Sequence, residues 1–503
     1  MLLLVRISRA YCPYSSIDNS GYKWGERNRL IPPESEIVTM TILNWQPDLA
    51  QQRGPLYRAI ADALASDIRA GRLPVGTRLP THRDLAWNLK VTVGTVTRAY
   101  AEAERRGLIS GEVGRGTYVR PTSTITDPAL RGEPMGPDFV DLSLNRPQTG
   151  EEPALVAKGL REIAESPDLE ALLQYQPHAG RAIDRAAGAR WIARGGVKTN
   201  PSQVLVTQSG QNAVASVLSA VTQPGDTVAV ESLTYPGVRS AASLLSLRLA
   251  PVAMDEQGLL PDAVASLCRG GSVKALYTLP SLHNPTATVL PVERRRALAE
   301  IARTHGIALV EDDVYGFLLK DAPPPVASFA PERSFYITST SKSLAPGLRI
   351  GYVHGPEEAV DRVAAALRAT IYMATPLMAA LATRWIEDGI ADRLVEQKRA
   401  EIVARQKLVR EMLAGFRLSG HPAAPHLLLW LPEGWRADAF ETAIRREGVG
   451  VTAATAFWLG RSNPPNAVRL CLGTPVRRAE VVRGLERIAA LLKRPPEADL
   501  SVI

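Results

Sequence analysis

The chain has 503 residues, of which 45% are hydrophobic and 22% are charged, a composition typical of a folded globular protein rather than a disordered one. It contains no run of about 18 uncharged apolar residues, which excludes an ordinary membrane-spanning helix. The three cysteines are widely separated and form neither a disulfide framework nor a C-x-x-C metal motif, so we expect no metal site and a reducing cytoplasm. The length predicts two or three domains.

The net charge of +8 is concentrated in one short segment. Between Arg53 and Arg120, twelve Arg and Lys residues are opposed by six Asp and Glu residues, so this segment carries +6 and the rest of the chain only +2. Such a basic module is suited to neutralising the phosphates of nucleic acid. A generic basic surface remains an alternative on charge alone.

Residues 1–40 show neither helical nor strand periodicity. They begin with the apolar run MLLLV, which Arg6 and Arg9 interrupt, and no small-residue cleavage site follows. This pattern argues against a signal peptide. We expect a disordered or mis-assigned extension, with Met40 as the true start.

Residues 41–120 predict a small domain of three helices and a wing. Pro55 suits the first turn of a helix, and the apolar ridge of that helix recurs every four residues until Gly71. Its expected ridge is Leu56, Ile60, Leu64 and Ile68. The segment LPVGTRLP at 73–80 predicts a turn.

Thr81 and Thr92 are suited to capping the second and third helices, which are separated by the short spacing of a helix-turn-helix. The second helix is expected to end at Leu89. The expected apolar face of the third helix is Val93, Val96, Tyr100 and Ala103. Beyond Gly107, LISGEVGRGTYV predicts two short strands around a glycine-rich tip that carries Arg115.

Three segments, GRLPVGTRLPTHRDLA, VTVGTVTRAYAEAERRGLI and GRGTYV, together resemble the GntR-type winged helix. The resemblance implies that the third helix enters the major groove of DNA, with the wing near the minor groove. It implies base or phosphate contacts by Thr92, Gly94, Thr95 and Thr97, and backbone or minor-groove contacts by Arg83 and Arg115. Relatives often carry polar or basic residues where Val93 and Gly94 stand, so base readout here is expected to rely on methyl contacts and DNA shape. For each threonine alone, a helix cap or a solvated helix face is the alternative.

Residues 121–139 are rich in Pro, Gly, Ser and Thr and predict a linker. Beyond them, short β-branched runs alternate with helical patterns, which favours an α/β fold with a mostly parallel sheet. The expected strands are 204–207, 228–230, 273–279, 307–313 and 335–338. Later runs at 427–431 and 468–472 predict a smaller α+β subdomain at the end of the chain.

The segment STSKSLAPGLRIGY at 339–352 follows an expected strand and combines a lysine, hydroxyl residues and an arginine. Pyridoxal phosphate (PLP) requires such a set, because Lys342 would form a Schiff base with its aldehyde, while Ser339 and Arg349 would bind its phosphate. A lysine among serines is weak evidence by itself, since most lysines lie on the surface.

Three further segments strengthen this interpretation. In EDDVY, Asp312 follows a buried strand and would pair with the pyridine nitrogen, with Tyr315 positioned toward the cofactor O3′. TQSGQNA at 207–213 places Ser209 and its neighbours between a strand and a helix N-terminus, which is a ready phosphate site. In HNPT, the Asn284 amide could donate to O3′, and Tyr235 could stack on the ring. Individually, these residues could instead be metal ligands, caps, turn formers or core aromatics.

The order of these motifs resembles the fold-type I aminotransferases of class I/II. The resemblance implies that Lys342, Asp312 and Tyr235 are catalytic, that Arg469 binds a substrate or effector carboxylate, and that Tyr175 reaches the phosphate of a partner subunit in a homodimer. It implies that PLP is bound by Ser209, Gly210, Gln211, Tyr235, Asn284, Asp312, Tyr315, Ser339, Lys342 and Arg349. This chain departs from the usual pattern at Ala287, at Q-S-G-Q and at Arg181-Ala182.

A winged helix joined to an aminotransferase fold resembles the MocR subgroup of GntR regulators. The expected architecture is a winged helix-turn-helix (α+β) domain followed by an α/β fold-type I aminotransferase domain at 140–495. The large subdomain is expected at about 180–375 and the small α+β subdomain at about 376–495. We expect a dimeric, cytoplasmic, bacterial regulator that binds operator DNA and senses PLP or an amino compound. The alternatives are a working aminotransferase with a DNA module and, less favoured because no cofactor position is lost, a PLP-free scaffold.

Overall fold

The computed structural model describes residues 45–47, 55–69, 72–73, 77–105, 108–112, 116–119, 136, 138–460 and 463–494. The extension predicted at 1–40, the wing residue Arg115 and most of the linker predicted at 121–139 lie outside these residues. The chain divides into two compact units between Thr124 and Ile125. Each unit is built around its own hydrophobic clusters.

The first unit contains the three predicted helices and a small antiparallel sheet of order β1-β3-β2. Its elements are α1 (Leu56–Arg69), β1 (Arg78–Leu79), α2 (His82–Leu89), α3 (Val93–Arg105), β2 (Ile109–Glu112) and β3 (Gly116–Val119). The turn expected at 73–80 contains β1, which sequence analysis missed because two residues are too short to show a strand period. Thr81 caps α2 by accepting a hydrogen bond from the Asp84 backbone N–H.

The core of this unit confirms most of the predicted apolar faces. Ile60, Leu64 and Ile68 of α1 are buried, as are Val96, Tyr100 and Ala103 of α3. Leu56 and Val93 were wrongly assigned to these faces: they are 42% and 46% exposed, because each is the first residue of its helix and projects beyond the packed turns. The Trp45 indole is also buried here and donates to the Asp67 carboxylate at 2.8 Å.

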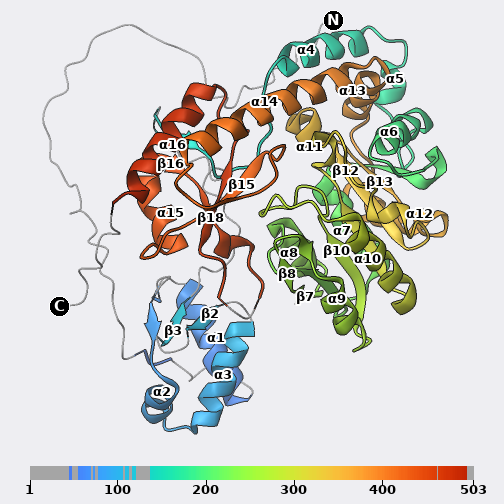
Figure 1. Ribbon diagram of the computed structural model, residues 1–503. Helices are drawn as coiled ribbons and strands as arrows, with labels where there is room; N and C mark the ends of the chain where they lie inside the picture. Colours follow the sequence, from blue (N-terminus) through green and yellow to red (C-terminus); the bar gives the residue numbers. More distant parts are fainter. Residues whose placement is uncertain are drawn as a thin grey trace, which may run out of the picture. The chain divides into compact units, whose positions relative to one another are not determined.

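The second unit is organised around a seven-stranded sheet of order β5-β13-β12-β11-β10-β6-β7 (Figure 1). Its strands are β5 (Val204–Thr207), β6 (Thr227–Glu231), β7 (Arg248–Val252), β10 (Val273–Thr278), β11 (Ala308–Asp312), β12 (Ser334–Ser339) and β13 (Gly351–His354). Six of these strands run in the same direction, and β13 runs opposite to them. Sequence analysis missed β7, a partly exposed edge strand that contains Pro251, and β13, which begins at the end of the lysine motif.

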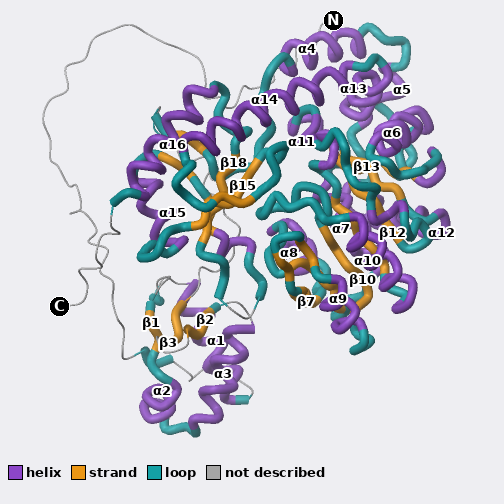
Figure 2. The backbone as a smooth tube through the Cα atoms, viewed as in Figure 1, coloured by secondary structure: helices purple, strands orange, loops and turns teal. Residues whose placement is uncertain are grey.

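Helices cover both faces of this sheet (Figure 2). They are α4 (Glu152–Ala164), α5 (Leu169–Leu172), α6 (Ala182–Arg194), α7 (Gly210–Val221), α8 (Pro236–Leu244), α9 (Pro261–Cys268), α10 (Val292–His305), α11 (Thr340–Ser343), α12 (Glu357–Ile371) and α13 (Pro376–Glu387). On β10, Tyr277 packs with residues of α7 and α12, whereas its neighbour Leu276 packs with residues of α9 and α10. The alternation of side chains along each strand thus fills two separate cores.

A smaller four-stranded antiparallel sheet of order β14-β15-β18-β17 follows the long helix α14 (Ile390–Met412). Its elements are β14 (Leu418–Ser419), β15 (His426–Trp430), β17 (Thr452–Ala453) and β18 (Ala467–Cys471), with α15 (Ala437–Arg446) and α16 (Arg478–Leu492). The strand β4 (Val140–Asp141) pairs in parallel with β16 (Val449–Gly450). The beginning of the second unit therefore packs with its C-terminal subdomain, an arrangement that sequence analysis did not anticipate.

Candidate functional site

The predicted site residues follow the carboxyl ends of strands that point the same way. Strands β12, β11, β10 and β6 are mutually parallel, and β5 shares their direction because β13 is antiparallel to both β5 and β12. Ser339, Gly351 and Thr207 lie in register across β12, β13 and β5. The segments that follow these strand ends consequently meet at one edge of the sheet, where ligands bind in open α/β folds.

Asp312 is the last residue of β11 and is 4% exposed. The Tyr277 hydroxyl donates to its Oδ2 at 2.8 Å, whereas its Oδ1 is buried and has no hydrogen-bond partner among the described residues. Burial raises the pKa of Asp312 to about 7, which the Tyr277 hydrogen bond partly counters. One carboxylate oxygen is thus held by the fold, and the other is available to a ligand.

Lys342 lies in α11, one turn after β12. Ser339 caps this short helix by accepting from the Ser341 backbone N–H at 3.1 Å. Burial is the main cause that lowers the Lys342 pKa to about 8, from an ordinary 10.5, and nearby Arg469 contributes. The amine donates to the backbone carbonyl of Asn145.

The lowered pKa predicts how fast Lys342 reacts with an aldehyde. Only the unprotonated amine is nucleophilic, so the rate of covalent PLP attachment should rise about tenfold per pH unit below pH 8 and level off above it. Stopped-flow absorbance over a pH series measures this rate. A rate that continued to rise to pH 10.5, as expected for Nα-acetyl-lysine in solution, would show that burial does not lower this pKa.

The predicted phosphate-binding segment lies at the N-terminus of α7. Ser209 caps the helix by accepting from the Asn212 backbone N–H at 3.2 Å, and Gly210 is its first residue. A Cβ on Gly210 would lie 3.5 Å from the Ser339 Cβ, so these two predicted segments are neighbours. Gln211 donates to the Gly237 carbonyl at 2.8 Å, and its buried Oε1 has no hydrogen-bond partner in the part of the chain that the structure describes.

Tyr235, the residue before α8, lies against the same loop. A Cβ on Gly237 would come within 2.4 Å of both the Tyr235 ring and the Gln211 amide oxygen, so a side chain at position 237 would displace them. Burial is the main cause that raises the Tyr235 pKa to about 12, and Asp312, Arg349 and Arg469 are close enough to influence it. Arg349 is exposed and has a φ of 52°, in the left-handed region.

Asn284 and Arg469 are in direct contact. The Arg469 Nη1 donates to Asn284 Oδ1 at 2.8 Å, and the guanidinium lies 4.6 Å from the centroid of the Phe457 ring. Its buried Nε has no partner among the described residues. Tyr315 is buried, and its ring lies edge-on to that of His426 at 5.4 Å. The Arg469 guanidinium and the Asn284 amide are therefore held side by side.

Tyr175 is 81% exposed and packs its ring on Tyr372, with centroids 5.1 Å apart. None of the contacts described for it involves another predicted site residue. Within a single chain, Tyr175 is thus not part of the cluster around Lys342.

Three residues of the site were missed by sequence analysis. Tyr277 lies within an expected strand. The only sequence signal for its position is the alternation of side chains along that strand, which places Tyr277 on the same face as Ala275. Asn145 and His426 contact each other at 2.8 Å, although they are 281 positions apart. No local signal could have paired them.

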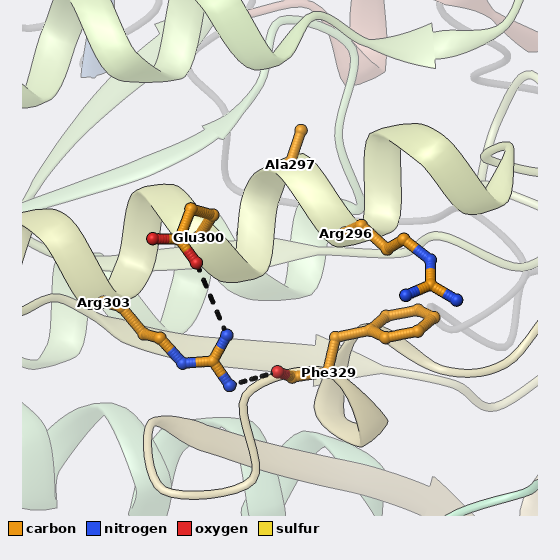
Figure 3. Close-up of a pocket in the computed structure, with 5 residues that line it drawn as sticks. All are labelled: Arg296, Ala297, Glu300, Arg303 and Phe329. Carbon is orange, nitrogen blue, oxygen red and sulfur yellow. Dashed lines mark hydrogen bonds and ion pairs between the residues drawn. The ribbon is translucent and has the colours of Figure 1, made fainter.

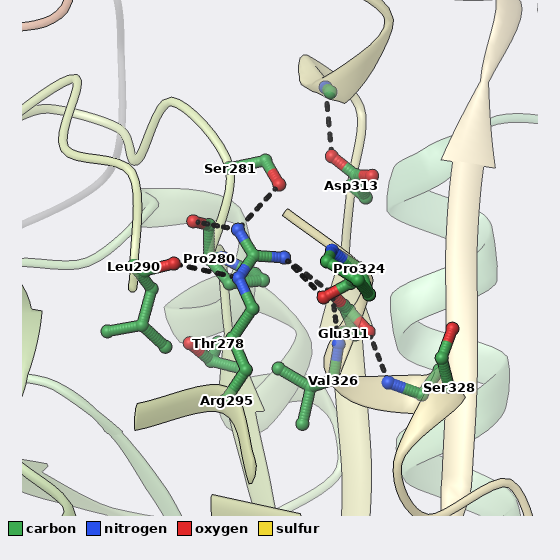
Figure 4. Close-up of polar contacts among 12 residues, drawn as sticks. Thr278, Pro280, Ser281, Leu290, Arg295, Glu311, Asp313, Pro324, Val326 and Ser328 are labelled. Carbon is green, nitrogen blue, oxygen red and sulfur yellow. Dashed lines mark hydrogen bonds and ion pairs between the residues drawn. The ribbon is translucent and has the colours of Figure 1, made fainter. Parts of the chain in front are cut away.

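A buried network behind the site joins the Asn284 loop to β11 (Figure 4). Arg295 of α10 is fully buried and lies 3.8 Å from the Glu311 carboxylate. It donates to the carbonyls of Pro280 and Leu290, both at 2.8 Å, and so ties together the two ends of the loop that carries Asn284. Arg295 is a positioning residue that sequence analysis did not identify.

One pocket lies away from these residues. It has a volume of about 410 Å³ and is lined by the exposed side of α10 and Phe329, over which the Arg296 guanidinium stacks at 4.5 Å (Figure 3). Arg303 in this pocket is already paired with Glu332 at 2.8 Å. No predicted site residue lines it.

In the first unit, the predicted DNA-facing residues gather at the start of α3. The Thr92 hydroxyl accepts from the Thr95 backbone N–H at 3.2 Å and contacts the Thr95 hydroxyl at 2.9 Å, while Thr97 donates to the Val93 carbonyl at 3.0 Å. These threonines therefore make local contacts within the helix, including the helix cap that was the alternative to a DNA contact. Gly94 and Val93 are exposed, and Arg83 is exposed on α2.

Among the described residues, no group of three or more His, Cys, Asp or Glu side chains could hold a metal ion. None of the helices in the described part of the chain combines the length and apolar character needed to span a bilayer.

Comparison with protein families gives two matches. Residues 137–488 match the model for aminotransferase class I and II, and residues 56–119 match the model for bacterial regulatory proteins of the gntR family. The chain is 33% identical over 451 residues to the uncharacterized HTH-type transcriptional regulator YdeF of Bacillus subtilis, a match that covers 90% of this chain and 97% of that protein. It is 28% identical over 484 residues to the HTH-type transcriptional regulator TauR of Rhodobacter capsulatus, covering 88% and 97%.

A solved structure resembles the second unit. The crystal structure of LysN, an alpha-aminoadipate aminotransferase from Thermus thermophilus complexed with N-(5′-phosphopyridoxyl)-L-leucine, superposes with a TM-score of 0.65. The two are 25% identical, and the match covers 71% of this chain and 92% of that one.

Proposed function

Because the chain belongs to the aminotransferase class I and II family and carries a gntR-family DNA-binding domain, we propose that it is a transcription regulator of the MocR type that senses PLP or an amino compound. The predicted architecture, a winged helix followed by a fold-type I aminotransferase, is confirmed. We propose the predicted domain bounds of 41–120 and 140–495, with the intervening residues as a linker.

PLP binding is supported by the groups left available at the sheet edge. The unpartnered Asp312 Oδ1 fits the pyridine nitrogen, the Lys342 amine fits covalent attachment, and the α7 N-terminus with Ser209 fits a phosphate. When bound, PLP supplies an aldehyde that condenses with amines and a ring that withdraws electrons. In this proposal Ser339, Arg349, Gly210 and Gln211 hold the phosphate, Tyr235 stacks on the ring, and Asn284 and Tyr315 contact O3′.

Arg469 supports an effector that carries a carboxylate as well as an amine. Its Nε is buried and has no partner within the described ranges, and a guanidinium can bind a carboxylate through two parallel hydrogen bonds. The amine of the same ligand would exchange with Lys342. We therefore propose an amino acid or related compound as the effector. The main support for this function is that one chain contains both this site and a gntR-family DNA-binding domain.

We propose that the regulator acts as a homodimer in the bacterial cytoplasm. Leu173 and Tyr175 expose 66% and 81% of their surfaces on one short segment, next to Tyr372 at 43%. Apolar side chains so exposed mark protein contact surfaces. A partner subunit would cover this patch and receive Tyr175 at its own phosphate site.

DNA binding is tested with the full chain and DNA from upstream of its own gene. We expect Arg83→Ala to weaken binding several-fold and to reduce the slope of log affinity against log salt by about one, because one phosphate contact is lost. Arg269→Ala, which removes an exposed arginine at the end of α9, is the matched control and should change neither value. Equal behaviour of the two variants would show that α2 does not contact DNA.

A working aminotransferase is the second candidate, favoured by the assembly of Lys342, Asp312 and Arg469 at one sheet edge. In that case Lys342 would also move a proton between the substrate Cα and the cofactor. Transfer of the amino group from an added amino acid to a 2-oxo acid by the purified protein supports this function. Ligand-dependent DNA binding without turnover supports the regulator alone.

A further inference from the structure

A short segment crosses the site close to Lys342. We call residues 142–145, which follow β4, the strap. The first three strap carbonyls accept hydrogen bonds from the small subdomain: Leu142 from the Cys471 N–H, Ser143 from Thr452 and Arg469, and Leu144 from Thr474. At the fourth carbonyl, that of Asn145, the donor is instead Lys342 of the large subdomain. The strap thus connects the two subdomains at the reactive amine.

The Asn145 side chain holds this carbonyl in position. Its Nδ2 donates to His426 Nδ1 at 2.8 Å, and His426 Nε2 donates to the His283 carbonyl at 2.9 Å. Burial lowers the His426 pKa to about 3, so the ring is neutral at physiological pH and can accept at Nδ1 while donating at Nε2. Both ends of the Asn145–His426 pair are fixed by the fold.

We propose that Asn145 is the positioning residue through which the chemical state of Lys342 reaches the chain segment leading to the winged helix; this rests on the sensing function proposed above. As a free amine, Lys342 has hydrogens to donate to the Asn145 carbonyl. As the nitrogen of a double bond to carbon, it keeps at most one hydrogen and is a poorer donor. The strength of the Lys342–Asn145 contact therefore depends on whether Lys342 is covalently engaged.

Ligand exchange restores this donor. The ligand's primary amine forms the double bond to the carbon that Lys342 held, and Lys342 leaves as a primary amine with the two hydrogens that the ligand nitrogen gave up. Neither partner is oxidised or reduced. The released amine then ties the strap, and with it the small subdomain, to α11.

The strap lies in the chain just after the segment that leads from the first unit, so the Lys342–Asn145 contact can influence that segment. The strap continues directly from β4, whose pairing with β16 attaches it to the small subdomain. Among the described residues, β4 is the first strand of the second unit, which begins at Ile125. A change at Lys342 that shifts the small subdomain therefore also shifts the point where the proposed linker ends.

The test uses the PLP-loaded full chain and aminooxyacetate, a small carboxylate whose amino group displaces lysine from PLP. Hydrogen–deuterium exchange is followed in peptides covering residues 140–148, and DNA affinity is measured in parallel. On adding the probe, we expect strap exchange to slow at least about fivefold in the unmodified protein and less than about twofold in Asn145→Ala. The visible absorbance of lysine-bound PLP should disappear on probe addition in both.

Ser143→Ala is the matched control, since its hydroxyl bonds only to Asp141 among the described contacts and its carbonyl remains; it should behave like the unmodified protein. An equal slowing of strap exchange in Asn145→Ala, or no slowing in the unmodified protein, overturns the proposal. If the strap responds in the unmodified protein and not in Asn145→Ala, while DNA affinity stays constant throughout, the role of Asn145 is supported and the regulatory function is wrong.

Discussion

Lys342→Ala is expected to abolish the visible absorbance of lysine-bound PLP and to remove any effect of an amino ligand on DNA affinity. The alanine has no amine to bond covalently, whereas Asp312, Ser209 and the α7 N-terminus keep their positions. PLP should therefore still bind, but only non-covalently. Absorbance spectra of the purified variant with added PLP, together with DNA titrations with and without ligand, measure both effects.

Lys320→Ala is the control for this prediction. Lys320 is 70% exposed and pairs with Glu396 at 3.4 Å, so its removal deletes a lysine without altering the sheet edge. The spectrum and the ligand response should match those of the unmodified protein. A lysine-bound spectrum retained in Lys342→Ala would mean that another lysine is the attachment point, and the proposed PLP site would be wrong.

Arg295→Leu is expected to destabilise the second unit by roughly 3–5 kcal/mol, the usual cost of removing one partner of a buried ion pair. The substitution leaves the Glu311 carboxylate buried without its cation, and burial already raises the pKa of that group to about 7. It also removes the Arg295 hydrogen bonds to the Leu290 and Pro280 carbonyls, of which, among the described contacts, only that of Pro280 keeps another donor, the Leu290 backbone N–H. Urea unfolding followed by circular dichroism measures the loss.

Arg303→Leu, on the same helix, is the matched control. Arg303 is 42% exposed and pairs with Glu332 on the surface, where an ion pair contributes about 1 kcal/mol or less. If the two variants lost equal stability, the network of Figure 4 would not be a significant source of stability. A second readout is PLP affinity, which should fall only in Arg295→Leu because that arginine positions the Asn284 loop.

The sequence predicted those parts of the molecule that depend on local pattern. The strand β5 and the helix caps at Thr81 and Thr92 are set by neighbouring residues, and the structure contains them. Lys342 and Asp312 could be proposed as site residues from the sequence, because each belongs to a short motif that follows an apolar strand. Leu56 was assigned to the core wrongly because a helical period does not show where the packing partner ends.

The features that the sequence did not predict depend on contacts between segments far apart in the chain. The strap uses backbone carbonyls, which every residue possesses, so no residue type in DLSLN indicates that it meets Lys342. Arg295 lies in VERRRALAE beside two other arginines, and only its burial distinguishes it from them. The Tyr277–Asp312 contact joins two strands whose adjacency is fixed only when the sheet is assembled.

Three consecutive acidic residues, Glu311, Asp312 and Asp313, lie at and just after the end of β11, and each has different partners. Glu311 faces Arg295 and accepts from the Val326 and Ala327 backbone N–H groups, whereas Asp313 accepts from the Tyr336 hydroxyl. Between them, Asp312 is the one whose carboxylate has a buried oxygen, Oδ1, with no hydrogen-bond partner among the described residues. Because side chains alternate along a strand, a slip by one residue would offer the wrong acid to the ligand and deprive Arg295 of its counter-ion. Strand register, rather than charge, thus decides which of the three acidic residues is placed to meet the proposed ligand.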